Sequence, residues 1–349
     1  MVARAMPNHP FNAPQGRLTH ITVRSDALAG NLLGDPHERR VSVYLPKGYD
    51  DGDRDYPLLV DLAAFSSSGL KRTAWRAFEE TLPQRIDRLV AEGKMGPVVL
   101  AMPDAFTRLG GNQYIDTPAV GNWATFLTQD LVPALEGAFR VRRGREHRGL
   151  FGKSSGGYGA LVHGMLYPET WGAVACHSGD IGWEWGVRSG FPELCTRLQS
   201  TGGDPAAWLE NIWNRPTFKG SDFHCMMLLA LCASYDPDPT APYGIRLPFD
   251  PYTCEVDEQA WQRWCEHDPL VMLEKSASQQ ALSALKGLYI DCGDQDEYHL
   301  QYGARRFVDR LCELGIGHVW EAFSGTHRGT DPRMDVSLPY LYAALTGDE

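Results

Sequence analysis

A serine between two glycines, near the middle of the chain, is the residue best suited to do chemistry. An apolar run ends at Phe151, and residues 152–156 (Gly-Lys-Ser-Ser-Gly) follow it in the pattern Gly-x-Ser-x-Gly. In this pattern a strand turns sharply into a helix, and the turn holds the serine hydroxyl where an imidazole can take its proton. The N–H of the next residue then faces the carbonyl under attack. The pattern predicts Ser154 as a nucleophile and the Ser155 N–H as half of an oxyanion hole.

The letters Gly-Lys-Ser also end the phosphate-binding loop of nucleotide-binding proteins. That loop needs a glycine five residues before its second glycine, and the chain has His147 at this position. A strand-to-helix turn without chemistry is the remaining alternative. An acid and then a histidine, in that order downstream, favour the nucleophile.

An acidic turn downstream offers the acid that would orient such a histidine. Residues 287–292 (Gly-Leu-Tyr-Ile-Asp-Cys) have the composition of a buried strand, and the turn comes directly after them. It contains three carboxylates, Asp294, Asp296 and Glu297. Composition and spacing leave all three open as the acid.

The base is expected on a loop that follows the last strand. Residues 318–323 have the pattern of that strand, and His327 lies four residues beyond them in a run of small residues. We therefore predict His327 as the base among the eleven histidines. His177, which follows another predicted strand, is an alternative base and an expected pocket residue. His299, three residues past Asp296, is the other alternative.

Strands and helices alternate along the chain in a way that positions these residues. The alternation predicts an α/β fold with a mostly parallel sheet, helices on both faces, and the reactive groups at the carboxyl edge. Because no linker interrupts the alternation, we predict one domain over residues 1–349. The expected strands are 18–23, 40–45, 57–62, 97–102, 148–151, 171–176, 287–292 and 318–323, and the clearest helices are 75–91, 123–139 and 302–314.

Composition narrows the classes of partner. The chain has 349 residues, 43% of them hydrophobic, and a net charge of -11, which argues against binding to nucleic acid. It contains no apolar run of about eighteen residues, and its first residues lack the apolar core of a signal peptide, so we expect a cytoplasmic protein that does not enter membranes. Eight cysteines without Cys-x-x-Cys spacing predict neither a metal cluster nor a redox dithiol. We expect no cofactor and no metal.

Several runs of residues carry a resemblance to a known family. They are 43–49 (Val-Tyr-Leu-Pro-Lys-Gly-Tyr), 56–59 (Tyr-Pro-Leu-Leu), 102–104 (Met-Pro-Asp), 126–133, and residues 152–160 with their additional glycines. The chain resembles the esterase D-like group of α/β-hydrolases over most of residues 17–182 and 285–346. This group includes S-formylglutathione hydrolases, feruloyl and acetyl-xylan esterases and siderophore esterases. The resemblance implies the α/β-hydrolase fold and a Ser-His-Asp triad.

The resemblance also assigns residues that spacing leaves open. In this group the acid is the aspartate of a Gly-x-x-Asp turn, which corresponds to Asp296. The histidine follows Gly-Gly in relatives, whereas His327 follows Gly-Thr here. Relatives carry His-Gly after the third strand where this chain has Ala-Ala at residues 63–64. The second oxyanion donor implied by the resemblance is the N–H of Phe65, with Ser66 as its rival.

A long aromatic-rich segment between two predicted strands is the least family-like part of the chain. A stretch of about a hundred residues is too long for an ordinary connection, so we predict a cap over residues 183–282. Trp183 and Trp185 are expected to line the pocket because they leave the sheet near its carboxyl edge. Asn112 and Tyr114 follow another strand end and are expected to form a second wall. The alternative is that the aromatic residues form the core of the cap itself.

Together these patterns predict a serine carboxylic-ester hydrolase that works through an acyl-enzyme intermediate. An acyltransferase with the same chemistry and a non-catalytic binding module are the alternatives. The expected partner is a small-molecule ester, and a homo-oligomer is left open.

Overall fold

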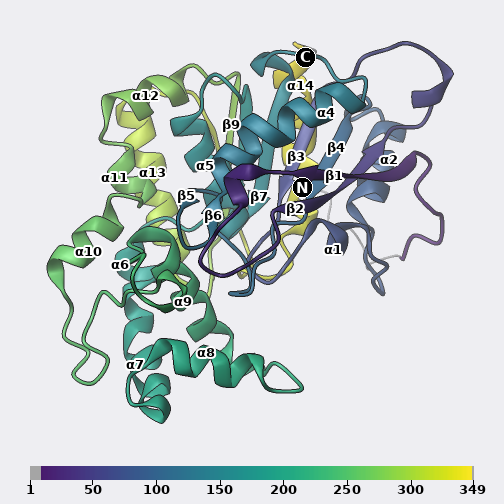
Figure 1. Ribbon diagram of the computed structural model, residues 1–349. Helices are drawn as coiled ribbons and strands as arrows, with labels where there is room; N and C mark the ends of the chain where they lie inside the picture. The colour runs from purple at the N-terminus through teal and green to yellow at the C-terminus, as the bar shows by residue number, and fades with distance from the viewer. Residues whose placement is uncertain (1–8, 348–349) are drawn as a thin grey trace.

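An eight-stranded sheet forms the centre of the computed structural model, which describes residues 9–347 (Figure 1). The first two neighbour pairs in the sheet, β1–β2 and β2–β4, are antiparallel, and all later pairs are parallel. Each of the eight predicted strands is present, with bounds within two residues of those expected. Their order in the sheet is β1 (Arg17–Arg24), β2 (Glu38–Leu45), β4 (Val99–Pro103), β3 (Leu58–Leu62), β7 (Arg148–Lys153), β8 (Ala173–His177), β9 (Gly287–Gly293) and β10 (Val319–Phe323).

Helices cover both faces of the sheet, which explains why its central strands are apolar throughout. Leu150 and Phe151 are neighbours on β7, and their side chains enter the hydrophobic clusters on opposite faces. The cluster around Phe151 includes α2 (Leu82–Ala91) and α14 (Met334–Thr346). The cluster around Leu150 includes α5 (Ser155–Leu166) and α13 (Leu300–Glu313). The smaller elements are α3 (Trp123–Thr125), a π-helical turn (Phe126–Leu131), α4 (Val132–Ala138), and the hairpin of β5 (Asp116–Thr117) and β6 (Gly121–Asn122).

The helix expected over residues 75–91 is shorter than predicted. The structure has α1 (Gly69–Thr73) and then α2, with no helix between them. Thr81 caps α2, because its hydroxyl accepts the N–H of Gln84 at 3.3 Å and the Gln84 side chain accepts the Thr81 N–H at 2.8 Å. With this reciprocal capping, α2 begins seven residues later than the apolar pattern indicated.

Residues 178–286 connect β8 to β9 and form a helical insertion beside the sheet (Figure 1). Its aromatic side chains pack against one another: the rings of Trp183 and Tyr235 lie 4.1 Å apart, and Trp264 lies 5.5 Å from Tyr235. No helix within residues 9–347 is both long and apolar enough to cross a membrane. The insertion contains α6 (Trp183–Gly186), α7 (Phe191–Leu198), α8 (Pro205–Trp213), α9 (Phe223–Tyr235), α10 (Glu258–Cys265), α11 (Pro269–Met272) and α12 (Ser276–Ser283).

We predict that Gly303→Ala destabilises the protein, because the backbone at the start of the insertion is in close contact with Gly303 of α13. A Cβ at Gly303 would lie 1.9 Å from the Ile181 carbonyl oxygen, so the backbone must move. We expect a loss of about 1–3 kcal/mol in the free energy of unfolding, measured by urea denaturation. Gly137→Ala in α4 is the matched control, because a Cβ there meets nothing within 4 Å. That variant is expected to be neutral or more stable by about 0.5–1 kcal/mol. Equal stability of the two variants would contradict the close contact.

Candidate active site

Ser154 occupies a strained turn between β7 and α5. Its φ of 56° and ψ of −124° are unusual for a residue with a side chain, and its N–H donates to the His177 carbonyl at 2.9 Å. A Cβ at Gly156 would lie 2.0 Å from the Leu62 carbonyl oxygen, and one at Gly152 would lie 2.6 Å from the same atom. The two glycines of the motif are therefore needed for β7 and α5 to approach β3 this closely.

The imidazole of His327 is held by a carboxylate. Its Nδ1 lies 2.8 Å from Asp296 Oδ2, and both side chains are buried. The other oxygen of Asp296 accepts the N–H of Tyr298 at 2.9 Å. With Nδ1 engaged, Nε2 is the nitrogen of His327 left to take a proton.

The other two acids of this turn accept hydrogen bonds from backbone N–H groups. Asp294 accepts the N–H of Gly325 at 3.0 Å, and Glu297 accepts the N–H of His327 at 2.7 Å. Of the three carboxylates that the sequence left open, Asp296 is the one that contacts the imidazole. The other two fix the loop that carries it.

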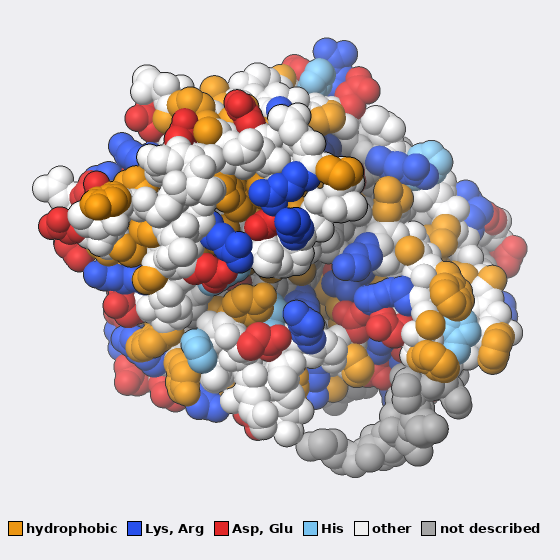
Figure 2. Space-filling view, turned by 90° about the horizontal axis from the view of Figure 1, so that it is seen from below, with side chains coloured by type: hydrophobic (Ala, Val, Ile, Leu, Met, Phe, Trp, Pro, Cys, Tyr) orange, Lys and Arg blue, Asp and Glu red, His pale blue; other side chains and the backbone are white. Residues whose placement is uncertain are grey.

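Ser154 and His327 line the same pocket, which has a volume of about 710 Å³. The pocket opens at the carboxyl ends of the parallel strands, where Figure 2 shows a hollow with Lys and Arg side chains around it. The insertion supplies part of its wall. The insertion contributes the apolar side chains of Val187, Phe223, Met227 and Leu231 to the pocket lining, and Phe65 and Leu300 also line the pocket.

The loop after β3 lies at the pocket and offers backbone N–H groups. The N–H of Ser66 donates to the Gly110 carbonyl at 2.6 Å, and that of Ser67 donates to Ala64 at 3.0 Å. Within the described part of the chain, the N–H of Phe65 has no such acceptor. Phe65 is therefore better placed than Ser66 to donate to a bound oxyanion. Ser155, at the start of α5, is buried, and its hydroxyl accepts the Gln113 side chain at 3.1 Å.

Asp180 is a pocket residue that the sequence reasoning missed. It follows β8 by three residues and lines the pocket together with Ser154. Burial raises its pKa to about 6, and the charge of His327 acts in the opposite direction. Its position just past the carboxyl end of a predicted strand was the signal that could have identified it.

His177 and His299 do not reach the pocket. His177 is buried at the end of β8, with Nδ1 2.9 Å from Asp291 and Nε2 2.9 Å from the Ser337 hydroxyl. The strand extends one residue further than predicted, which places this side chain inside the protein and corrects the expectation that it contacts substrate. His299 precedes α13 with a φ of 61° and is not among the pocket residues.

The four other side chains expected to contact substrate also lie outside this pocket. Trp183 is 1% exposed because it packs into the core of the insertion. Trp185 lies in a separate surface depression beside Arg306.

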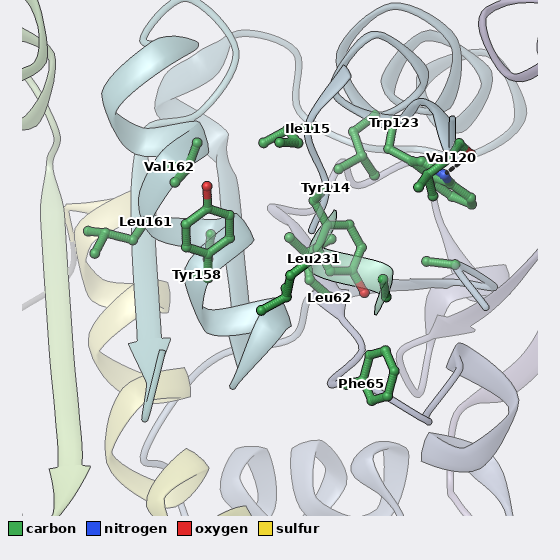
Figure 3. Packing of buried hydrophobic residues seen from close by; sticks show 14 of the residues in the cluster. Leu62, Phe65, Tyr114, Ile115, Val120, Trp123, Tyr158, Leu161, Val162 and Leu231 are labelled. Atoms are coloured by element: carbon green, nitrogen blue, oxygen red, sulfur yellow. Dashed lines mark hydrogen bonds between the residues drawn. The ribbon is translucent and has the colours of Figure 1, made fainter. Parts of the chain in front are cut away.

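The second expected wall, Asn112 and Tyr114, packs against the protein itself. Asn112 donates to the Ala105 carbonyl at 2.7 Å and so stabilises its own loop. Tyr114 donates to the Ala63 carbonyl at 2.6 Å and packs in the core with Leu62 and Leu231 (Figure 3).

Comparison with known proteins places this chain in a family. The Esterase family model, described as "Putative esterase", matches residues 35–330. An esterase of Mycobacterium tuberculosis is 33% identical over 144 residues, which are 40% of this chain and 28% of that relative. The match therefore spans less than a third of the relative's length.

Solved structures show the same fold. A ferulic acid esterase is 19% identical, with a TM-score of 0.61 over 95% of this chain and 100% of the other. An S-formylglutathione hydrolase from Staphylococcus aureus is 14% identical, with a TM-score of 0.58 over 94% and 99% of the two chains. These similarities identify the α/β-hydrolase fold. Since the family model spans most of the chain, the protein belongs to the Esterase family.

Proposed function

We propose that this protein is a serine carboxylic-ester hydrolase with Ser154 as nucleophile, His327 as base and Asp296 as the acid that orients the base. The observation that carries the proposal is that the strained serine and the carboxylate-held imidazole line one pocket. Membership of the Esterase family and the esterases among the structural neighbours support the same reaction.

In the proposed reaction, Nε2 of His327 accepts the Ser154 proton as the hydroxyl oxygen attacks the ester carbonyl carbon. Asp296 keeps Nδ1 protonated and stabilises the imidazolium that forms. The N–H groups of Phe65 and Ser155 donate to the oxyanion. The imidazolium then protonates the leaving alcohol, and water, deprotonated by the same histidine, releases the acid from the acyl-enzyme.

We further propose that the chain acts as one domain in which residues 183–282 form a cap over the site. The support is that α9 and the segments around it contribute Phe223, Met227 and Leu231 to the pocket wall. These flexible and aromatic side chains suit an apolar part of the ester. Their place in the pocket replaces the role first expected of Trp183 and Trp185.

We predict that the three proposed residues act as a unit. Ser154→Ala, His327→Ala and Asp296→Asn should each lower kcat by about 10³-fold or more, and the combined losses should not add. Steady-state kinetics with a 4-nitrophenyl ester would measure this. Asp294→Asn is the matched control on the same turn, because asparagine still accepts the Gly325 N–H, and activity within about tenfold of wild type is expected. Equal losses from Asp294→Asn and Asp296→Asn would show that the assignment of the acid is wrong.

We predict that Asp180→Asn moves the acid limb of the kcat/KM profile to lower pH. The pKa of Asp180 is raised to about 6 by burial, so above this pH it carries a negative charge that favours the imidazolium form of His327. Hydrolysis needs the neutral imidazole, so removing a negative charge that favours the cation should extend activity to lower pH. A shift of about half a pH unit or more is expected.

The control for this prediction is Glu184→Gln, which removes an acid with an exposed side chain from the same insertion. Its profile should match that of the wild type. A shift of the Asp180→Asn profile to higher pH, or no shift, would contradict the proposed electrostatic contact with His327.

A further inference from the structure

The pocket is lined by more positive than negative side chains, although the chain as a whole has a net charge of -11. Charge of one sign gathered in the cleft of a protein of the opposite sign concentrates ligands that carry the complementary charge. Six cationic and four acidic residues line the pocket: Lys71, Arg72, Arg76, Arg85, Lys153 and Arg328 against Glu80, Asp180, Glu193 and Asp331.

Most of these cations are balanced by carboxylates of the protein. Arg72 contacts Asp331 at 3.2 Å and buried Asp61 at 2.8 Å. Arg85 contacts Glu80 at 3.2 Å. Such pairs have structural partners and leave little charge for a ligand.

Lys153 differs from these arginines. It is partly buried at the last position of β7, it directly precedes Ser154, and within residues 9–347 its ammonium has no hydrogen bond or ion pair. Burial lowers its pKa, while the charges of Asp331, Asp296 and Glu297 act in the opposite direction. A charge withdrawn from water without a close partner costs free energy, so a pocket that keeps one is suited to a ligand that supplies the partner.

We propose that Lys153 binds a carboxylate of the ester substrate and so makes the enzyme selective for acidic esters. This inference rests on the proposed function, because it assumes that Ser154 attacks in this pocket. The ammonium is a compact charge suited to a single carboxylate. Phe223, Met227 and Leu231, which line the same pocket, would contact the apolar part of the same molecule.

The carboxylate could belong to the acyl or to the alcohol part, and two pairs of esters distinguish these sources. On the acyl side, mono-4-nitrophenyl succinate is compared with 4-nitrophenyl butyrate. On the alcohol side, 4-carboxyphenyl acetate is compared with 4-carbamoylphenyl acetate. The two esters of each pair differ mainly in charge. The kcat/KM of the acidic ester divided by that of the neutral ester therefore measures recognition of the carboxylate.

Lys153→Met should lower this ratio by about tenfold or more in one of the two pairs. Lys153→Arg, which keeps the charge, should retain a ratio closer to that of the wild type. Lys275→Met is the matched control, because it removes one positive charge at an exposed residue outside the pocket, and its ratios should equal those of the wild type.

Unchanged ratios for Lys153→Met in both pairs would overturn the inference, as would an equal fall for Lys275→Met. If Lys153→Met is insoluble, Lys153→Arg and Lys153→Gln are compared by the same ratios. Failure of the proposed function is recognised separately, because Ser154→Ala would then still hydrolyse the neutral esters.

Discussion

The close approach of β3 to the turn after β7 is the constraint on which the site depends. The Leu62 carbonyl lies so near Gly156 that a Cβ there would be 2.0 Å away, and Ser154 adopts a φ of 56° to complete the turn. The His177 carbonyl on β8 holds the Ser154 N–H from the other side. Three neighbouring strands therefore fix the serine, and the strain is offset by packing along the whole sheet.

The loop that carries His327 depends on buried charge rather than on regular structure. Arg333 donates to Asp291 on β9 at 3.1 Å, and Asp331 contacts Arg72, which also binds Asp61 on β3. These networks tie Asp331 and Arg333, which follow His327 in the chain, to two strands of the sheet. Because removing one partner leaves a buried charge unpaired, each network ties the position of the proposed base to the fold.

The sequence was most informative where structure is local. The eight strands, the Gly-x-Ser-x-Gly turn and the order of acid and histidine follow from short patterns, and all were visible before the fold was known. Asp296 was selected only through the Gly-x-x-Asp turn of the resembling family. Asp294 and Glu297 are also carboxylates, and they lie in the same turn. Their different hydrogen bonds become visible only when Gly325 and the strands are in place.

The contacts of the insertion could not be predicted in this way. Trp183 has the type and position of a pocket residue, but tertiary packing against Tyr235 buries it. Met227 and Leu231 line the pocket because tertiary packing brings α9 to its wall, and no pattern around them signals this. Asp180 and Lys153 were likewise unassigned. Both lie at or just past the carboxyl end of a predicted strand, but this position alone does not show that they line the pocket.

A second Ser-His-Asp set makes the identity of the nucleophile open to a direct test. Ser337, His177 and Asp291 are linked by hydrogen bonds of 2.9 Å, but all three are buried, whereas Ser154 lines the pocket. The decisive measurement is to treat the protein with a fluorophosphonate and locate the adduct by peptide mass spectrometry. We expect one adduct, on Ser154, which forms at the same rate as activity is lost. An adduct on Ser337, or loss of activity with Ser154 unmodified, would contradict it.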